Sequence, residues 1–105
     1  MLENRIYERQ KTNVKGRMLN VEDLDEAQIE AQDYSLTGIK VSTYKYLPAG
    51  SQVKIWLNTE KSKEIFCSGK VIWTKEKSTD SQIYETGIEF LDYKIKIYRA
   101  LELTT

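Results

Sequence analysis

Residues 33–43 read Asp-Tyr-Ser-Leu-Thr-Gly-Ile-Lys-Val-Ser-Thr, a turn followed directly by an alternating strand. In the second part, Ile39 and Val41 fall on one face and polar side chains on the other, which is the period of a half-buried β-strand. In the first part, Asp33 and Ser35 are two residues apart, so at a strand end their side chains point to the same face. The stretch therefore predicts two strands joined by a tight turn, with a carboxylate and a hydroxyl side by side.

Similar strand patterns recur along the rest of the chain at nearly regular spacing. They cover residues 13–21, 28–32, 53–57, 65–74 and 84–90. The segment 65–74 is long for a strand, and Gly69 within it suits a bend or a bulge. The charged residues 75–82 predict a hairpin loop after it. About six strands at this spacing predict an all-β fold, a small antiparallel barrel or sandwich.

The end of the chain changes period. After Asp92, apolar residues recur at three-residue spacing, at Ile95, Tyr98 and Leu101. This spacing predicts a short amphipathic helix that follows the last strand, with Asp92 as its N-cap.

The N-terminal residues 1–12 carry two arginines, Arg5 and Arg9, among polar neighbours. We interpret this segment as a flexible arm without firm regular structure, in front of a domain that spans residues 13–105. An arginine is a rigid fork of donors that pairs bidentately with phosphate or with the O6 and N7 atoms of guanine. In an extended arm the two Cα atoms lie up to about 13 Å apart, enough to hold a ligand from two sides.

Composition limits the possible functions. The chain has 105 residues, which suits one small domain, and its 16 basic residues balance 16 acidic ones. A general attraction to DNA, RNA or anionic lipid is therefore not expected. Histidine is absent, so the commonest general base and metal ligand are missing, and an enzyme is not expected. The single cysteine, Cys67, and the lack of a long apolar run or signal sequence favour the cytoplasm, without membrane insertion.

Each motif also has a plainer interpretation. Asp33, Ser35 and Gly38 are residues that any hairpin turn recruits, and Gly38 can take the positive φ that a tight reversal needs. Two arginines in a polar arm can simply belong to a solvated terminus. Taken singly, neither motif identifies a ligand site, and the interpretation depends on their combination.

In combination, the arginine pair before the first strand and the Asp-x-Ser-x-x-Gly turn between the second and third strands resemble the PilZ domain family. Later strands are similar as well, because residues 68–73 read Ser-Gly-Lys-Val-Ile-Trp and residues 84–90 read Tyr-Glu-Thr-Gly-Ile-Glu-Phe. The loop at residues 47–50, Leu-Pro-Ala-Gly, also leads into a strand as it does in the family. The resemblance covers essentially the whole chain.

The resemblance implies a six-stranded antiparallel barrel with a short C-terminal helix that binds the bacterial second messenger cyclic di-GMP. Carried over by motif, Arg5 and Arg9 would hold the phosphates and the O6/N7 edges of the guanines. Asp33 and Ser35 would read guanine's polar edge, and Gly38 would shape the turn. In the family the arginine arm tends to fold over the ligand, which would offer a changed surface to a partner protein. The resemblance thus implies a single-domain adaptor that is not an enzyme, needs no cofactor and acts on an unknown downstream partner.

Several alternatives remain open. Many family members carry further arginines beside the first motif arginine, whereas this chain has Asn4 and Ile6, so one bound dinucleotide is better supported than two stacked ones. A PilZ-like protein-interaction module that does not bind nucleotide is the second hypothesis. A small nucleic-acid-binding barrel of the OB type is the third, and the zero net charge argues against it.

Three further side chains have interpretations based on packing. Trp56 and Trp73 could stack on a base, but a barrel this small needs large apolar side chains, so packing in the core or at the rim is favoured. Cys67 lies on a face predicted to be inward, and we interpret it as a buried structural thiol.

Overall fold

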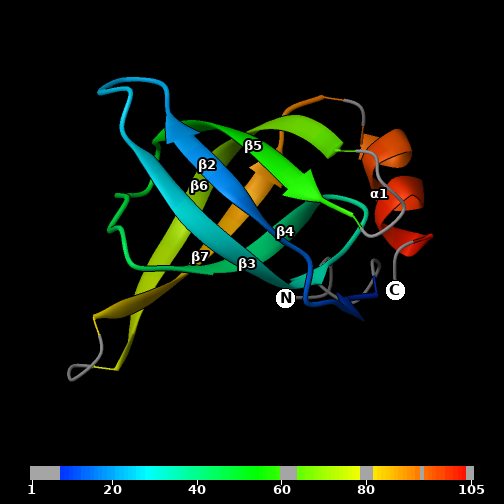
Figure 1. The fold of residues 1–105 in the computed structure, drawn as a ribbon, viewed down its shortest axis with the longest axis horizontal. Coiled ribbons are helices and arrows are strands. Elements are labelled where there is room, and N and C mark those ends of the chain that lie inside the picture. Colours follow the sequence, from blue (N-terminus) through cyan, green and yellow to red (C-terminus); the bar gives the residue numbers. More distant parts are fainter. Residues whose placement is uncertain (1–7, 60–63, 79–81, 93, 104–105) are drawn as a thin grey trace.

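The computed structural model describes residues 8–59, 64–78, 82–92 and 94–103 (Figure 1). Its strands are β1 (Gln10–Lys11), β2 (Lys15–Asn20), β3 (Glu26–Tyr34), β4 (Gly38–Thr43), β5 (Gln52–Asn58), β6 (Glu64–Ser78) and β7 (Ile83–Phe90), and its helix is α1 (Lys94–Glu102). The strands β2 to β7 and the helix correspond to the elements expected from the periodicity. β1 differs from the prediction, since it lies within the segment interpreted as an irregular arm and pairs with the end of β3.

The strands form one closed antiparallel barrel. Their order is β1-β3-β2-β5-β6-β7-β4, and a further pairing of β3 with β4 closes the circle. All of these pairs are antiparallel. Closure pairs β2 to β7 on both sides, which removes most of the open edge that an unclosed sheet would present. The predicted six-stranded antiparallel barrel with a C-terminal helix is confirmed.

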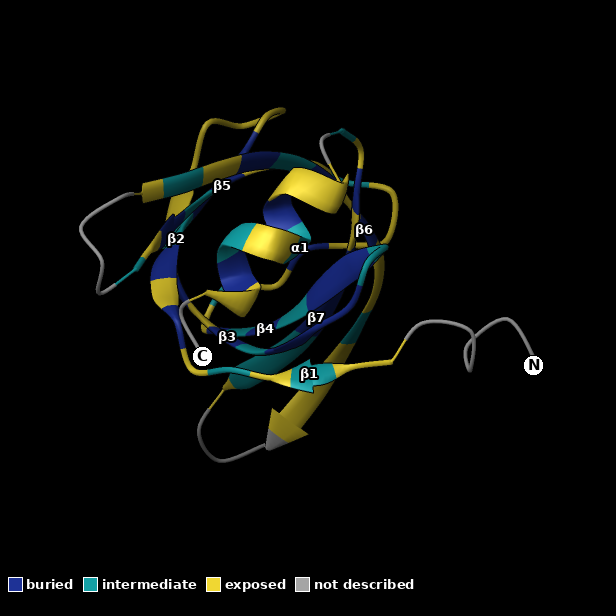
Figure 2. Ribbon diagram, turned by 90° about the vertical axis from the view of Figure 1, so that its right-hand side faces the viewer, coloured by how far each residue is buried: buried dark blue, intermediate teal, exposed yellow. Residues whose placement is uncertain are grey.

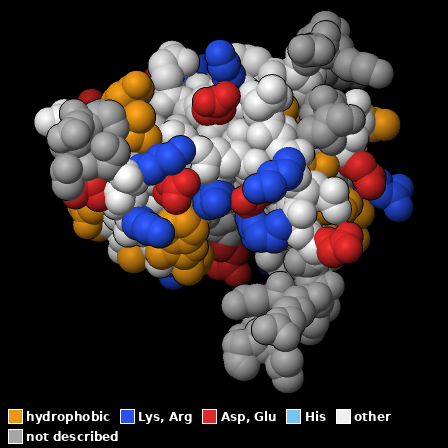
Figure 3. Space-filling model, turned by 90° about the horizontal axis from the view of Figure 1, so that it is seen from below, with side chains coloured by type: hydrophobic (Ala, Val, Ile, Leu, Met, Phe, Trp, Pro, Cys, Tyr) orange, Lys and Arg blue, Asp and Glu red, His pale blue; other side chains and the backbone are white. Residues whose placement is uncertain are grey.

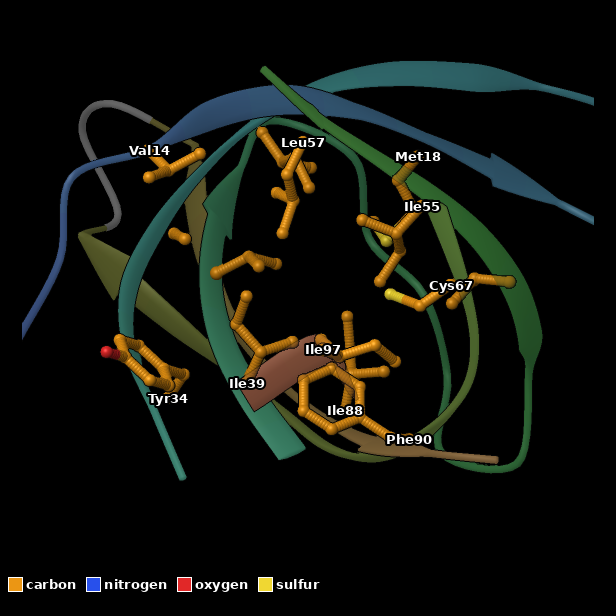
Figure 4. Packing of buried hydrophobic residues seen from close by; sticks show 14 of the residues in the cluster. Val14, Met18, Tyr34, Ile39, Ile55, Leu57, Cys67, Ile88, Phe90 and Ile97 are labelled. Carbon is orange, nitrogen blue, oxygen red and sulfur yellow. The ribbon is translucent and has the colours of Figure 1, made fainter. Parts of the chain in front are cut away.

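Apolar and polar side chains alternate along the strands, and the apolar ones fill the interior of the barrel. On β5, Val53, Ile55 and Leu57 are buried, while the residues between them face outward. Figure 4 shows inward side chains from different parts of the barrel wall, including Ile39 of β4, Ile55 of β5 and Phe90 of β7, pointing into the same interior space. A fully buried side chain of this size contributes about 1.5–3 kcal/mol relative to an exposed one. The hydrophobic core therefore lies inside the barrel and makes it a firm support for the outer surface.

The helix α1 closes one end of the barrel (Figure 2). Its buried side chains, Ile97 and Leu101, lie one turn apart on the same helix face. Tyr98 packs edge-to-face on the buried Tyr34, with ring centroids 5.4 Å apart. The helix begins after Asp92, whose Oδ1 atom is buried without a hydrogen-bond partner among the described residues. The N-cap role of Asp92 stays a prediction. Within the described ranges, no helix has the length and apolar character needed to cross a membrane.

The strand β6 contains a bulge, and it does not lie at Gly69. The register with β7 shifts between Val71 and Trp73, so that Ile72 is an extra residue. A bulge of this kind places two successive side chains on the same face and bends the strand. A bulge at Gly69, one of the two features predicted there, is therefore wrong, because Gly69 pairs in regular register with Val53 and Phe90. Glycine is needed there for a different reason, since a Cβ atom would come within 2.4 Å of the Ile88 side chain.

The charged segment predicted as a hairpin loop at residues 75–82 is partly strand. β6 continues to Ser78, with a second irregularity between Glu76 and Ser78, and β7 begins at Ile83. In Figure 1 this end of the β6–β7 ribbon extends beyond the barrel. Lys75, Glu76 and the next lysine are all exposed. Because both faces of the ribbon meet solvent, its sequence carries no hydrophobic alternation and indicates a loop.

Cys67 is buried inside the barrel, as predicted. Burial raises the pKa of its thiol to about 12, and the negative charge of Asp92 adds to this increase. The thiol is therefore neutral at physiological pH and belongs to the core rather than to a reactive site.

Candidate functional site

Three of the predicted site residues meet at the end of β3. The Nε atom of Arg9 lies 2.6 Å from Oδ1 of Asp33, and its Nη1 atom donates to Oγ of Ser35 at 3.3 Å. The Asp33 side chain is only 10% exposed, whereas that of Arg9 is 48% exposed. The Arg9 guanidinium therefore contacts two sheltered acceptors on one side and the solvent on the other. A ligand that arrives from the solvent can replace these acceptors as its partner.

The strand β1 brings Arg9 to this position. Arg9 directly precedes β1, whose two residues pair with the last two residues of β3. The N–H of Thr12 donates to the carbonyl of Gln32 at 3.1 Å and extends the pairing. Backbone hydrogen bonds therefore fix the base of the Arg9 side chain beside the turn. Arg5 lies outside the described residues, and its role stays a prediction.

Ser35 supports the turn that follows β3. Its N–H donates to the carbonyl of Gly38 at 2.8 Å, and its Oγ accepts from the N–H of Thr37 at 3.2 Å. Ser35 itself is almost fully buried. Its hydroxyl therefore has the structural role expected of any turn serine and also accepts a hydrogen bond from Arg9.

Gly38 lies at the site for a reason that differs from the prediction. Among the described glycines only Gly50 has a positive φ, of 98°, so the expected left-handed conformation at Gly38 is wrong. Gly38 is the first residue of β4 and pairs with Glu89 of β7. A Cβ atom on Gly38 would lie 2.2 Å from the carbonyl oxygen of Ile88. Glycine is required because the β7 backbone comes this close.

These residues open onto a surface pocket of about 600 Å³. Its lining includes all four predicted residues that the structure describes, namely Arg9, Asp33, Ser35 and Gly38. This volume falls within the range of about 300–1,000 Å³ that is typical of small-molecule sites. Arg9 and the three residues of the turn motif thus line one pocket whose volume is typical of small-molecule sites.

The pocket also contains residues that the sequence analysis missed. Lys40 lies with its Nζ atom 3.4 Å from Oδ2 of Asp33, and Glu89 and Trp73 form part of the wall. Lys40 could have been found, because it lies two residues after Gly38 on β4 and its side chain therefore points to the same face of the strand. Glu89 and Trp73 could not, since their positions depend on the pairing of β7 with β4 and on the bulge in β6.

The charges in the pocket are balanced. Arg9 and Lys40 supply two cations, and Asp33 and Glu89 supply two anions. Figure 3 shows basic and acidic side chains interspersed over the middle of one face of the molecule, rather than one extended basic patch. Such a site suits a small ligand that combines anionic groups with hydrogen-bond donors. In the part of the chain that the structure describes, no group of three or more Cys, Asp or Glu side chains is placed to hold a metal ion.

The fold is similar to that of solved PilZ domains. The PilZ domain of YcgR from Escherichia coli, solved with c-di-GMP, has a TM-score of 0.70 at 15% identity and covers 91% of this chain and 84% of its own. MotI/DgrA, an inhibitor of motility from Bacillus subtilis, has a TM-score of 0.71 at 14% identity. It covers 93% of this chain but only 48% of its own, so the present chain spans about half of that protein. The PilZ domain of CeSA from a cellulose-synthesizing bacterium has a TM-score of 0.66 at 15% identity and covers 90% and 94%. At these identities the similarity shows a shared fold.

The family follows from the sequence itself. No curated protein is similar enough in sequence to count as a match. The family model of the PilZ domain, however, matches residues 3–103, nearly the full length. The matched range includes both motif arginines and the whole turn after β3. This chain therefore belongs to the PilZ domain family.

Proposed function

We propose that this PilZ domain is a receptor for cyclic di-GMP and has no catalytic activity of its own. The observation that carries the proposal is the convergence of Arg9, Asp33 and Ser35 on one pocket of about 600 Å³. The YcgR domain with the same fold was solved with c-di-GMP. A regulatory binding module also agrees with the lack of histidine and with a site whose polar groups are carboxylates, hydroxyls and two cations.

The chemistry of the pocket matches the two kinds of group in the ligand. The Watson–Crick edge of guanine presents N1–H and N2–H donors, and the Asp33 carboxylate can accept both. Arg9 can pair bidentately with a phosphate or with guanine O6 and N7. Lys40 adds a second cation beside Asp33, and Arg5 of the arm would add a third. Two phosphate charges can therefore be matched by cations that lie in or near the pocket.

Ligand binding would replace interactions that the protein makes with itself. Both oxygens of Asp33 are engaged, Oδ1 by Arg9 and Oδ2 by Lys40. Because Arg9 is about half exposed, its ion pair is worth no more than about 1 kcal/mol. A dissociation constant of about 1 μM corresponds to about 8 kcal/mol of binding free energy. The free energy lost by breaking the internal pair is thus small beside the free energy of binding.

Transmission of the signal would pass through the N-terminal arm. Arg9 directly precedes β1, which is paired with β3, so a ligand that engages Arg9 and Arg5 together would draw the part of the arm before β1 over the pocket. The closed arm would present a new surface to a downstream protein in the bacterial cytoplasm. The ligand can shift the arm only by its preference for the closed state. The chain would then act as a single-domain adaptor.

A thermal-shift titration tests the proposal. A ligand that binds only the folded state stabilises it by about 2.7 kcal/mol at a hundred times its dissociation constant. For a domain of this size that is a rise in Tm of about 10 °C or more. We expect cyclic di-GMP to raise the Tm in this way and cyclic di-AMP to raise it far less. No shift with cyclic di-GMP at about 1 mM, a thousandfold above micromolar affinity, would contradict the proposal.

A second candidate function is a protein-interaction module that does not bind nucleotide. The observation in its favour is that Arg9 and Lys40 already satisfy the Asp33 carboxylate and leave the pocket charge balanced. In that case the Arg9–Asp33 pair would serve to attach β1 to the barrel. The same titration separates the two functions, because this module would show no shift with any cyclic dinucleotide.

A further inference from the structure

The outer surface of β2, β5 and the first half of β6 carries a group of basic and aromatic side chains. β5 pairs with β2 on one side and with residues 64–70 of β6 on the other, so the outward side chains of the three strands are neighbours (Figure 1). Four of them are cations and one, that of Glu64, is a carboxylate. The basic and aromatic members, which we name the β5 face, are Lys15, Arg17, Lys54, Trp56, Phe66 and Lys70. In a chain without net charge, this is a local excess of positive charge.

Two of these cations lie against aromatic rings. The guanidinium carbon of Arg17 is 4.1 Å from the centroid of the Trp56 ring, and Nζ of Lys54 is 5.6 Å from the centroid of the Phe66 ring. The two rings are also in contact with each other, with centroids 5.3 Å apart. A long basic side chain that rests on a ring has less freedom to lose when it binds a partner. The centre of the β5 face is therefore ordered before any partner arrives.

The charges and the apolar surface of the β5 face are open to solvent. Among the described residues, no carboxylate lies within ion-pair distance of Lys54 or Lys70. Arg17 pairs with Glu26 of β3 at 3.6 Å, but both side chains are exposed, so this pair is weak and easily exchanged. Phe66 is 47% exposed. The face thus offers both unpaired cations and an apolar ring to a partner.

The strand pairing and the position of the cations limit what can bind here. β5 is paired on both sides along its length, so a partner cannot add a strand at the centre of the face and must be recognised by side chains. Single-stranded nucleic acid would need free ring faces for its bases, and here Arg17 and Lys54 already lie over the rings. Carboxylates need only the cations. The geometry therefore favours acidic side chains over a nucleic acid.

We propose that the β5 face is a docking surface for an acidic segment of a partner protein, with an apolar side chain among its carboxylates. The carboxylates pair with Arg17, Lys54 and Lys70, and the apolar side chain packs on Phe66. Charge complementarity is the basis of the choice, because four cations stand against one carboxylate on this wall.

The β5 face is separate from the nucleotide pocket proposed above. Around the barrel, β5 is connected to β4 through β6 and β7 in one direction and through β2 and β3 in the other. The two strands therefore lie on opposite walls, and the pocket is lined from the wall that contains β4, without any residue of the β5 face. A docked partner can stay bound whether the pocket is empty or filled, and the docking role holds even if the pocket binds no nucleotide.

A fluorescence titration with a defined probe tests this role. The probe is a short blocked peptide of Glu and Asp residues around a central Leu, and the protein is the full chain with Trp73→Phe, in which Trp56 is the only tryptophan. We expect a saturable change in Trp56 emission, because carboxylates that engage Arg17 change the surroundings of the ring it covers. The dissociation constant should be of order 1 mM or lower and should rise with salt. The same peptide with Gln and Asn in place of its acids should not bind.

Two substitutions in this chain locate the binding, once circular dichroism shows each variant to be folded. Lys54→Glu should weaken peptide binding on the order of tenfold, since it replaces an attraction by a repulsion. Phe66→Ser should weaken it by a similar factor, because the apolar contact is lost. Lys75→Glu is the matched control, an exposed lysine of the same β6 strand beyond the face, and should bind like its parent. If Phe66→Ser fails to fold, the comparison of Lys54→Glu with Lys75→Glu decides.

The remaining outcomes would each overturn the proposal. Constant Trp56 emission with the acidic peptide, or equal affinities of Lys54→Glu and Lys75→Glu, would show that the β5 face does not dock acidic segments. Equally tight binding of a single-stranded oligonucleotide or of vesicles with anionic lipid would make the face a general anion surface. Emission that depends on protein concentration without peptide would indicate a second copy of the chain as the occupant. None of these results bears on cyclic di-GMP binding, which is measured separately.

Discussion

Arg9 and Asp33, which are 24 residues apart in the sequence, form an ion pair of 2.6 Å at the rim of a surface pocket. The pair joins the end of the N-terminal arm to the end of β3, and it brings together two motifs that have no local reason to meet. The carboxylate is sheltered and the guanidinium is half exposed. A ligand that competes for both partners would therefore act on the junction between the arm and the barrel.

Lys40 should contribute long-range attraction for an anionic ligand. Its Nζ atom lies 3.4 Å from Asp33 Oδ2 and it lines the pocket. We expect Lys40→Gln to weaken cyclic di-GMP binding several-fold at low salt and to reduce the dependence of affinity on ionic strength, because one screened charge is removed. Lys54→Gln, on the outward face of β5, is the control. Titrations at two salt concentrations measure the effect, and parallel salt dependences in parent and Lys40→Gln would exclude this role.

Asp33 should decide which base is accepted. Its carboxylate can receive the N1–H and N2–H donors of guanine but gains little from adenine, which lacks that pair of donors. We expect Asp33→Ala to lower affinity for cyclic di-GMP by about tenfold or more, the value of one lost charge-assisted contact of about 1.5–3 kcal/mol. Affinity for cyclic di-AMP should change much less. Competition titrations give both values, and equal losses for the two ligands would count against Asp33 as the guanine reader.

Gly38 and Gly50 should respond differently to substitution by alanine. At Gly38 the new Cβ would meet the Ile88 carbonyl oxygen at 2.2 Å, so β4 and β7 must separate at the pocket. We expect Gly38→Ala to cost about 1–3 kcal/mol of stability and to lower ligand affinity as well. Gly50 has a φ of 98° and open space around it, so Gly50→Ala should cost about 1–2 kcal/mol through backbone strain without changing affinity. Urea unfolding and ligand titration of both variants check this, and undiminished affinity in Gly38→Ala would show that the strand spacing does not matter to the site.

Cys67 should make the stability of the barrel fall at alkaline pH. Burial, with a smaller effect of the Asp92 charge, raises the pKa of the folded thiol to about 12, whereas an unfolded cysteine titrates near about 8.5. The contribution to stability is therefore complete below about pH 8.5 and is lost as the pH rises toward about 12, with a slope of up to about 1.4 kcal/mol per pH unit. Urea unfolding at about pH 8 and about pH 10 measures this loss. The Cys67→Ala variant should lack the extra decline, and an equal decline in both chains would contradict a buried neutral thiol.

Much of the fold was predictable because alternation and core formation have the same cause. Ile39 and Val41, or Val53, Ile55 and Leu57, are apolar at every second position because one face of each strand lines the barrel interior. The C-terminal helix was predictable because the spacing of the apolar residues changes from two to three after Asp92. The bulge at Ile72 was not predictable, since it depends on how β6 meets β7 and leaves an unbroken apolar sequence. The exposed end of the β6–β7 ribbon was predicted as a loop rather than as strand. Both of its faces meet solvent, so its sequence shows no alternation of apolar and polar residues.

The candidate site was predictable where a motif fixed the residue and not where tertiary pairing did. Arg9, Asp33 and Ser35 meet as the motifs indicated. Gly38 was found for an incorrect reason, because close approach of β7 rather than a turn conformation requires it. Trp73 was assigned to packing because a barrel this small needs large apolar side chains, and the structure instead places it in the pocket wall beside the bulge.

A calorimetric titration of cyclic di-GMP into three chains, the parent, Arg9→Ala and Arg17→Ala, tests the binding site itself. Arg17 is the matched control, since it also forms an ion pair, with Glu26 at 3.6 Å, and its side chain is 38% exposed, but it lies outside the pocket. We expect saturable binding by the parent and by Arg17→Ala, and binding at least about a hundredfold weaker by Arg9→Ala, as for loss of a bidentate charged contact. All three chains should have similar stability, because surface ion pairs contribute about 0–1 kcal/mol. Equal binding by parent and Arg9→Ala, or no binding by the parent, would show that the junction of Arg9 and Asp33 is not the ligand site.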